Sequence, residues 1–509
     1  MIENTFQSAK KPELLLPAGS PEKLLYAMAY GADAVYMGLP MASLRTPGRG
    51  DQFSQKNLAH YVHLAQDQGV KVYITINIFP SNPDLKRIIP HLEQLQDIQP
   101  NAIIFTDTGT YRLAKQYAPD IPLHLSTQAN TLNTEACAFW QDMGVQRVIL
   151  AREVPYREIV EIHEALPTLE LECFIHGSIC VAYSGRCVIS DYLTDNTKNS
   201  NKGMCGNSCR WSFVSTDDSS PQSQSIRSEK SAAIYPGPGG LNTETHYESE
   251  NVDLKHITMA EAFRPDEPYT FEEDDKGSYM LNSKDLCLIR HLHELQQAGI
   301  CSFKIEGRTK SVFYAATTAR VYRQAIDILC GNAQNHLSVD EIQLTQWVAE
   351  LAEAGNRGFT EGFYNGRPDG TAYNYQDTES QQTSRFLALT AMKEGFTIPE
   401  DTVNQNTPLV YFVVKNPFQV GDTIDWVTPQ GIFSFELTRL LNQDGFPLYQ
   451  AKTNHKVAIP LPERIYQALF EKQWPINPAI YKEKLQWSIL KMPIFSQPMS
   501  GSKKQPQLV

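Results

Sequence analysis

The sequence predicts an α/β protein: a TIM-like (β/α)8 barrel with a long cysteine-containing insertion after its seventh strand, followed by a small C-terminal β-barrel domain. Three observations lead to this prediction. Short β-branched or apolar runs alternate with amphipathic helical stretches over the first 330 residues. The alternation breaks once, after Gly177, for about a hundred residues, far longer than an ordinary loop. From about Arg385 onward, successive strand-like runs and tight turns predict hairpins.

The barrel prediction depends on the number of strand-like runs. Helical patterns such as Pro21–Tyr30, Thr134–Met143 and Lys284–Ala298 lie between the runs, and this alternation is typical of parallel βαβ units. Eight units match the barrel. An open doubly wound sheet is the alternative, but no Gly-x-Gly-x-x-Gly follows the first run. The eight runs are Leu14–Ala18, Ala34–Leu39, Lys71–Ile78, Ala102–Asp107, Leu123–Gln128, Arg147–Arg152, Leu171–Gly177 and Cys301–Gly307.

These patterns divide the chain into domains. We expect the catalytic barrel over residues 1–335, including a cysteine-rich and acidic insertion over 178–283. A helical connector over 336–384 and the small β-barrel over 385–482 should follow. The Lys-, Pro- and Ser-rich tail over 483–509 is expected to be flexible.

Composition and charge limit the classes of protein. With 41% hydrophobic and 20% charged residues, the chain is typical of globular proteins. No apolar run reaches the roughly 18 residues of a membrane helix, and the N-terminus lacks a signal peptide, so we expect a cytoplasmic protein. The net charge of −12 argues against a nucleic-acid partner. However, residues 217–276 hold 14 acidic and 5 basic side chains, so the rest of the chain is nearly neutral and allows a local basic face.

Four of the nine cysteines form the most informative motif. Cys180, Cys187, Cys205 and Cys209 follow the pattern C-x6-C-x17-C-x3-C in the loop that leaves the seventh barrel strand, on the face where barrel enzymes hold their active sites. Four thiolates suit a [4Fe–4S] cluster. Structural zinc is an alternative, although it usually depends on C-x2-C pairs, and unliganded thiols are another. The other cysteines are expected to pack as small hydrophobes; they are Cys137, Cys173, Cys287, Cys301 and Cys330.

The segment Glu172–Ser190, which contains the first two cysteines, resembles the signature of the peptidase U32 family. The resemblance extends over most of the chain and implies a [4Fe–4S] enzyme. It is strongest to the branch that hydroxylates the wobble uridine of tRNA with prephenate as co-substrate. The remaining motifs that carry it are Pro17–Gly19, Gly31–Tyr36, Ser126–Asn130, Gly203–Trp211, Leu281–Asp285, Lys304–Lys310, Arg357–Phe363, Asn416–Phe418 and Gly421–Asp422.

Two other activities and a non-catalytic role stay open. A related branch implies ribosomal RNA as the substrate, and the chain could also be an RNA-binding scaffold. The family's name implies proteolysis, yet the sequence contains neither His-Glu-x-x-His nor Gly-x-Ser-x-Gly. A thiol–imidazole pair could still be built from Cys180 and His176.

Polar residues at the ends of the strand-like runs predict the site, because these ends meet at one mouth of a barrel. Asn77 and Asp107 are among them. Prephenate, a dicarboxylate, needs fixed cations, which Arg supplies best. Each such Arg could instead pair with a neighbouring carboxylate, and His176 could be structural. We predict His176, Glu306 and Arg308 as catalytic residues and Arg45, Gln128, Arg152, Arg186 and Lys304 as substrate-binding residues.

The anticodon loop of tRNA is the expected macromolecular partner. Lys304, Arg308, Lys310 and Arg320 are predicted to form one basic side, and Arg210–Trp211 offers a cation beside an aromatic ring. Lys and Arg contact phosphates, and aromatic rings stack on unpaired bases. A solvated charged face without RNA is the alternative.

Overall fold

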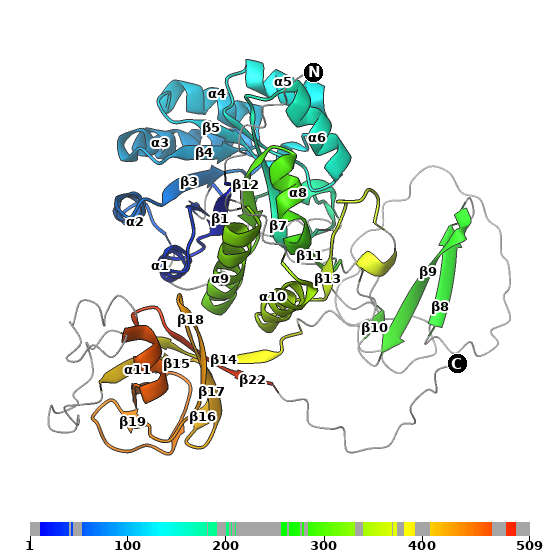
Figure 1. Ribbon diagram of the computed structural model, residues 1–509. Helices are drawn as coiled ribbons and strands as arrows, with labels where there is room; N and C mark the ends of the chain where they lie inside the picture. Colours follow the sequence, from blue (N-terminus) through cyan, green and yellow to red (C-terminus); the bar gives the residue numbers. More distant parts are fainter. Residues whose placement is uncertain are drawn as a thin grey trace, which may run out of the picture.

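The computed structural model describes residues 11–39, 42–43, 53–180, 182–190, 200–202, 205, 209, 256–261, 264–274, 277–278, 283–330, 339–368, 370–373, 381–391, 408–470 and 485–494. A parallel barrel surrounded by helices lies beside a C-terminal β domain (Figure 1). The predicted α/β architecture is confirmed.

Eight parallel strands close the barrel, because β12 pairs with both β1 and β7. They occupy the seven predicted runs before the insertion and the eighth run, which follows it. The strands are β1 (Glu13–Pro17), β2 (Ala34–Met37), β3 (Lys71–Ile76), β4 (Ala102–Phe105), β5 (Leu123–Leu125), β6 (Arg147–Ile149), β7 (Glu170–Ser178) and β12 (Ile300–Ile305).

Helices cover the outside of the barrel, and side-chain caps fix where several of them begin. Ser20 accepts a hydrogen bond from the backbone of Lys23, and Asp107 does the same for Thr110. Ser311 accepts one from the Tyr314 backbone and begins the longest helix. The helices around the barrel are α1 (Pro21–Ala29), α2 (Leu58–Asp67), α3 (Asn82–Ile98), α4 (Thr108–Tyr117), α5 (Thr134–Asp142), α6 (Tyr156–Ala165), α8 (Leu292–Gln297), α9 (Val312–Leu329) and α10 (Glu341–Glu353). A further helix, α11 (Glu463–Phe470), packs in the core of the C-terminal domain.

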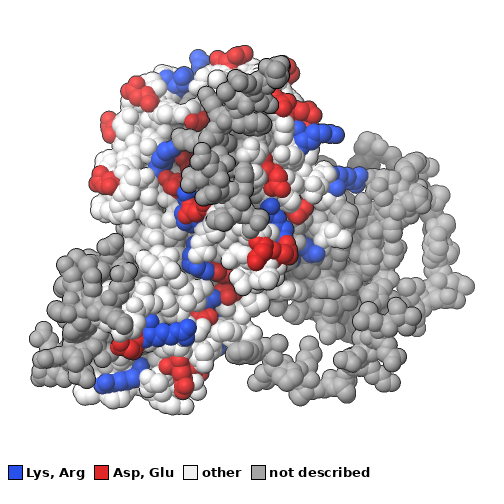
Figure 2. Space-filling view, viewed as in Figure 1, with Lys and Arg blue, Asp and Glu red and all other residues white. Residues whose placement is uncertain are grey.

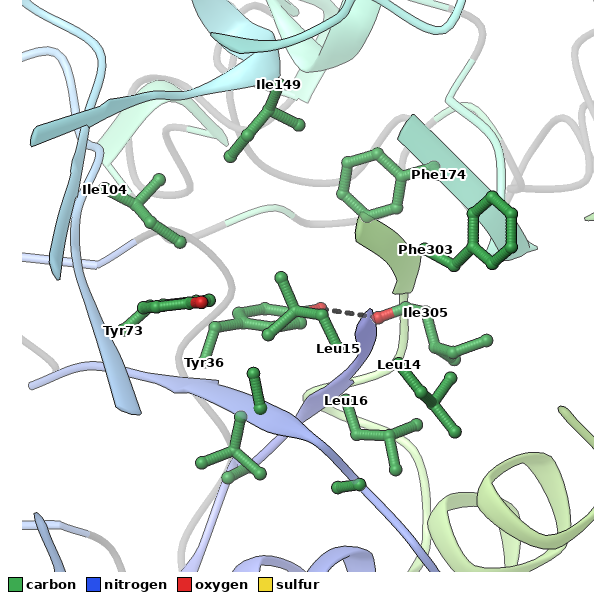
Figure 3. Packing of buried hydrophobic residues seen from close by; sticks show 14 of the residues in the cluster. Leu14, Leu15, Leu16, Tyr36, Tyr73, Ile104, Ile149, Phe174, Phe303 and Ile305 are labelled. Atoms are coloured by element: carbon green, nitrogen blue, oxygen red, sulfur yellow. Dashed lines mark hydrogen bonds between the residues drawn. The ribbon is translucent and has the colours of Figure 1, made fainter. Parts of the chain in front are cut away.

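The strands alternate their side chains between the barrel interior and the helix layer (Figure 3). Leu15, Tyr36 and Tyr73 face the interior, whereas Leu14 and Leu16 face the helices. The Tyr36 hydroxyl donates a 2.9 Å hydrogen bond to the backbone oxygen of Ile305, which ties β2 to the end of β12 across the interior.

Two segments extend the barrel sheet beyond the eight strands. β11 (Asp285–Cys287) runs antiparallel to β7, and β13 (Phe359–Thr360) runs parallel to β11. The predicted helix over Lys284–Ala298 is therefore wrong in its first part, because Asp285–Cys287 completes a sheet edge. Part of the predicted connector also belongs to the barrel, since β13 pairs with its sheet and α10 packs on α9.

The acidic insertion contains a small antiparallel sheet of its own. It is built from β8 (His256–Glu261), β9 (Arg264–Asp274) and β10 (Gly277–Ser278), in the order β10-β9-β8. Nothing in the hydrophobic pattern predicted these strands, since the stretch is rich in charged residues.

The C-terminal domain is built from antiparallel strands, as the turns predicted. A seven-stranded sheet has the order β18-β17-β22-β14-β15-β21-β19, and β16 pairs with β20. Among the described residues, no pairing joins the outer strands β18 and β19. The strands are β14 (Ser384–Thr390), β15 (Leu409–Val414), β16 (Phe418–Gln419), β17 (Thr423–Thr428), β18 (Gly431–Glu436), β19 (Leu441–Asn442), β20 (Gln450–Ala451), β21 (Lys456–Pro460) and β22 (Ile489–Pro493).

The prediction of a flexible tail over 483–509 is wrong for residues 489–493, which form β22 between β14 and β17. Ile489 packs with the barrel core, and Leu490 packs with the core of the C-terminal domain. Both side chains are fully buried. The strand therefore joins two cores, and its short apolar run was hidden in a polar composition.

The two domains share a packed interface. Tyr30 of α1 donates hydrogen bonds to the backbone oxygens of Trp487, at 2.8 Å, and Val427, at 3.3 Å. Lys491 of β22 pairs with Glu353 of α10. These contacts place the C-terminal domain against α1, α9 and α10 (Figure 1).

Candidate active site

The barrel mouth, at the carboxyl ends of the strands, brings together most of the predicted site residues that the structure describes. Arg152 follows β6 and Gln128 follows β5. Lys304 lies in β12, while Glu306 and Arg308 follow it. These five residues therefore come from three loops and one strand and meet at the carboxyl ends of the strands, as expected for a parallel barrel.

Arg152 is held at the mouth by several contacts. Its guanidinium donates a 2.6 Å hydrogen bond to the backbone oxygen of Ser178 and lies 3.4 Å from a carboxylate oxygen of Glu306. The same group lies over the ring of Phe174, 4.0 Å from its centre. Glu306 is also fixed through its backbone. Its N–H donates to the backbone oxygen of His176, and its backbone oxygen accepts from the Tyr314 hydroxyl.

Two further cations lie over aromatic rings in the interior. The Lys304 ammonium is 4.6 Å from the centre of the Tyr36 ring and 5.4 Å from that of Phe174. The Arg308 guanidinium lies 5.7 Å from the centre of the Tyr36 ring and donates to the hydroxyls of Ser43 and Thr75. Arg152, Lys304 and Arg308 therefore surround two aromatic rings, an arrangement that can receive an anion.

Burial disfavours the charged form of Lys304. Lys304 is almost fully buried, and burial lowers its pKa. The carboxylate of Glu172, 2.9 Å from the Lys304 ammonium, opposes this effect. Lys304 thus joins the mouth to a charged network below it.

Sequence reasoning missed that network. Arg147 contacts the carboxylates of Glu13 at 2.9 Å, Glu170 at 2.7 Å and Glu172 at 3.0 Å. The Tyr73 hydroxyl also donates to Glu13. The available signal was Glu172, a charged residue inside the mostly apolar run Leu171–Gly177. A charge buried in such a strand needs partners of opposite charge.

Two more predicted residues, Arg186 and Asn77, lie at the rim of the mouth. Arg186 is exposed, donates a 2.8 Å hydrogen bond to the backbone oxygen of Gln128 and lies over the ring of Phe79. Asn77 donates to the side chain of Gln128 at 3.4 Å. Asp107, predicted to point toward the mouth, instead caps α4.

His176 does not face the mouth. The β7–β12 register shifts after Phe174, so Ile175 is an extra residue and His176 turns to the helix side. Its ring contacts Tyr314, Tyr322 and Phe359, and its Nδ1 lies 3.2 Å from the Tyr322 hydroxyl. Burial lowers its pKa to about 4, so the ring is neutral at physiological pH. The structure thus separates the predicted catalytic histidine from the other predicted site residues.

The predicted basic RNA-binding side is wrong, because three of its four residues are buried. Lys304 and Arg308 lie inside the barrel, and Arg320 pairs with Glu350 of α10. Lys310 is partly buried and lies 3.9 Å from Asp285. On the face that Figure 2 shows, positive and negative side chains are interspersed over the described surface. Arg45 and the Arg210–Trp211 pair lie outside the described residues.

The predicted metal ligands lie in the loop after β7 and beyond it. Cys180 and Cys187 are partly exposed, and the Asn201 side chain donates to the Cys187 oxygen and accepts from its N–H, at 2.8 and 3.3 Å. This contact places Asn201, which precedes Cys205 by four residues in the sequence, next to Cys187. Within the described ranges, no group of three or more His, Cys, Asp or Glu is arranged around a metal position. The cluster ligands therefore remain a prediction, which is supported by the residue type and by the contact between Asn201 and Cys187.

The other five cysteines differ chemically from these four. Burial raises the pKa of Cys137, Cys301 and Cys330 to about 12, so their thiols stay protonated. Cys173 and Cys287 are also buried. Protonated, buried thiols suit packing rather than metal binding.

A surface hollow beside Cys180 was not predicted. It is lined by the aromatic side chains of Phe363 and Tyr373, the hydroxyl residues Ser283 and Thr360, and Glu153. The motif Arg357–Phe363 supplies part of this wall and was the sequence signal available. Among the described residues, none of the helices has the length and apolar character needed to span a membrane.

Comparisons with known proteins agree with the resemblance seen in the sequence. The profile described as "Peptidase family U32" matches residues 19–374, and the family's C-terminal domain matches residues 400–470. The chain is similar to "tRNA hydroxylation protein P" of Escherichia coli, with 37% identity over 89% of this chain and 94% of that one. The Haemophilus influenzae protein of the same name is 39% identical over 85% and 89%. "tRNA hydroxylation protein P1" of Bacillus subtilis is 32% identical over 87% and 90%.

Proposed function

This chain belongs to the peptidase U32 family, and we propose that it hydroxylates the wobble uridine of tRNA with prephenate as co-substrate. The observation that carries the reaction class is its similarity, over nearly the whole length of both chains, to proteins named for tRNA hydroxylation. We also propose that the protein works in the cytoplasm, where a tRNA-modifying enzyme meets its substrate. Conversion of C–H to C–OH adds one oxygen atom to the base and removes two electrons from it, so the reaction needs a second substrate that donates the oxygen and accepts the electrons, the role that we give to prephenate.

The barrel mouth supports an anionic co-substrate. Arg152, Lys304 and Arg308 surround Tyr36 and Phe174, which gives fixed cations beside two flat apolar surfaces. Prephenate combines two carboxylates with a six-membered ring, and both features find a counterpart here. We assign its carboxylates to Arg152 and Arg308, with Lys304 beneath.

We further propose that Cys180, Cys187, Cys205 and Cys209 hold a [4Fe–4S] cluster. The set offers four thiols of the required type, and its first member, Cys180, follows the carboxyl end of β7, where the mouth opens. When bound, such a cluster supplies redox or Lewis-acid chemistry next to the mouth. The protein's own part is to orient both substrates and to exclude water.

The cluster proposal is tested by metal analysis of protein purified without oxygen. We expect about four irons and four sulfides per chain, lost when the four ligand cysteines are changed to Ala. A matched control changes the buried Cys137 and Cys330 to Ala and should keep the iron. Stoichiometric zinc, or iron that survives in the four-cysteine variant, would contradict this assignment.

The activity is tested by incubating the purified protein with unmodified tRNA, with and without prephenate, and by measuring 5-hydroxyuridine after digestion to nucleosides. We expect product only with prephenate. Ribosomal RNA and a protein substrate are assayed in parallel. Modification of ribosomal RNA alone, or peptide cleavage without nucleoside product, would overturn the proposed function.

A further inference from the structure

One segment of the chain, described over residues 178–180 and 182–184, borders two different compartments. Its beginning belongs to the barrel mouth, where Ser178 accepts a hydrogen bond from Arg152. Its end is fixed by Glu153, whose carboxylate accepts from the N–H and hydroxyl of Ser184. Arg152 and Glu153 are consecutive residues, so they hold this segment from both ends, and Cys180 lies between the two contacts.

The second compartment is the hollow beside Cys180, and its chemistry differs from that of the mouth. None of the described residues that line it is Lys or Arg. Its lining instead includes the aromatic residues Phe363 and Tyr373, the hydroxyl residues Ser283 and Thr360, and the acidic residue Glu153. A dicarboxylate would find no cation there, whereas a flat, neutral group with hydrogen-bonding edges would find partners.

The far wall of the hollow is held rigidly. Arg357, at the start of the motif that forms it, makes a buried ion pair with Asp285 of β11. Gly362 has a φ of +58°, and a Cβ there would lie 3.1 Å from the side chain of Leu286. The backbone can therefore pack closely on β11 and present Phe363 to the hollow.

We propose that this hollow receives the target uracil, turned out of the anticodon loop, while the anionic co-substrate occupies the mouth. This inference rests on the proposed function and adds the place of each substrate. Uracil is neutral and planar, with one N–H donor and two carbonyl acceptors, which suits aromatic and hydroxyl groups. The segment with Cys180 then lies between the two substrates.

The direct test does not require turnover. An anticodon stem–loop RNA with 5-iodouridine at the wobble position is bound to the full-length protein and irradiated, and the crosslinked peptide is identified by mass spectrometry. We expect crosslinks to Phe363, Tyr373 or Tyr183, which line the hollow. Crosslinks confined to Tyr36 or Phe174 of the mouth, or to neither compartment, would overturn the inference.

Substitutions give a second test. Phe363→Ala and Thr360→Val are expected to raise the KM for tRNA at least tenfold, with the KM for prephenate changed less than twofold. Tyr364→Ala is the matched control, because Tyr364 adjoins Phe363 but stacks on His291, with ring centres 4.0 Å apart. If wild type hydroxylates tRNA and the Phe363 and Tyr364 variants behave alike, the inference fails while the function stands. If wild type is inactive but crosslinks at the hollow, the proposed function fails while the base site stands.

Discussion

The two ends of the barrel interior hold charge in different ways. At the amino-terminal end, which we call the floor, Arg147 contacts the carboxylates of Glu13, Glu170 and Glu172 within 3.0 Å. Glu172 also pairs with Lys304. Each of these carboxylates therefore faces a cation, and Arg147, Glu13 and Glu172 are nearly closed to water, whereas Glu170 is partly exposed.

At the mouth, neutral groups do much of the positioning. Arg308 is oriented by the hydroxyls of Ser43 and Thr75 and by the ring of Tyr36. Arg152 donates to a backbone oxygen at 2.6 Å, whereas its ion-pair partner Glu306 is 3.4 Å away. The described contacts of these two cations are mostly with neutral groups, whereas those of Arg147 are with carboxylates, which stabilise the fold.

The largest expected effect is on the floor. Glu172→Gln removes the carboxylate shared by Arg147 and Lys304, so two buried cations lose a partner. We expect the free energy of unfolding to fall by about 3–5 kcal/mol, measured by denaturant titration. Glu170→Gln is the matched control, because Glu170 contacts the same Arg147 but its side chain is 36% exposed, and it should cost at most about 1 kcal/mol. Equal losses in both variants would contradict a closed floor.

The next effect tests whether His176 belongs to the mouth or to the core. Above pH 6.5 its ring is neutral in both the folded and the unfolded state. Below that pH the unfolded chain binds a proton that the folded chain resists until about pH 4. The free energy of unfolding should therefore fall by roughly 3 kcal/mol as pH decreases from 6.5 to 4.

His176→Gln should lose this part of the pH dependence, measured as the difference in unfolding free energy between variant and wild type across that window. His91, whose pKa burial also lowers to about 4, remains in both proteins and cancels. Activity at neutral pH should fall less than tenfold. A loss of activity beyond a hundredfold in a folded variant would return His176 to a catalytic role.

A smaller effect is expected at the mouth. Arg308→Lys keeps the charge but loses the planar fork that contacts Ser43 and Thr75. We expect weaker binding of prephenate by tenfold to a hundredfold, measured by calorimetry, with the free energy of unfolding changed by about 1 kcal/mol. Prephenate affinity equal to that of wild type would show that the anion binds elsewhere.

The sequence predicted the barrel and the mouth because both follow from local patterns. Strand-like runs ended within three residues of the strand ends, and polar residues there met at one edge, as Arg152 and Glu306 show. His176 was misplaced because one extra residue in β7 reverses the side-chain alternation, and a single bulge leaves no periodic signal.

Contacts between distant segments were the other source of error. Arg320 and Lys304 were predicted to be surface cations, but both are buried in ion pairs. Arg320 pairs with Glu350 and Lys304 with Glu172, and neither carboxylate is near its partner in the sequence. The hollow beside Cys180 was missed for the same reason. Its walls come from the loop after β7 and from Phe363, about 180 residues later.

The smallest expected effect concerns the interface between the two domains, which extends the contrast between structural and functional contacts. Tyr30→Phe removes a hydroxyl that donates to the backbone oxygens of Trp487 and Val427. The ring remains and still packs near Tyr26, so only the hydrogen bonds are lost. We expect a decrease in the free energy of unfolding of about 1 kcal/mol, with KM for tRNA and prephenate unchanged. Raised KM for tRNA in a variant of wild-type stability would instead mean that docking of the C-terminal domain on α1 positions the RNA.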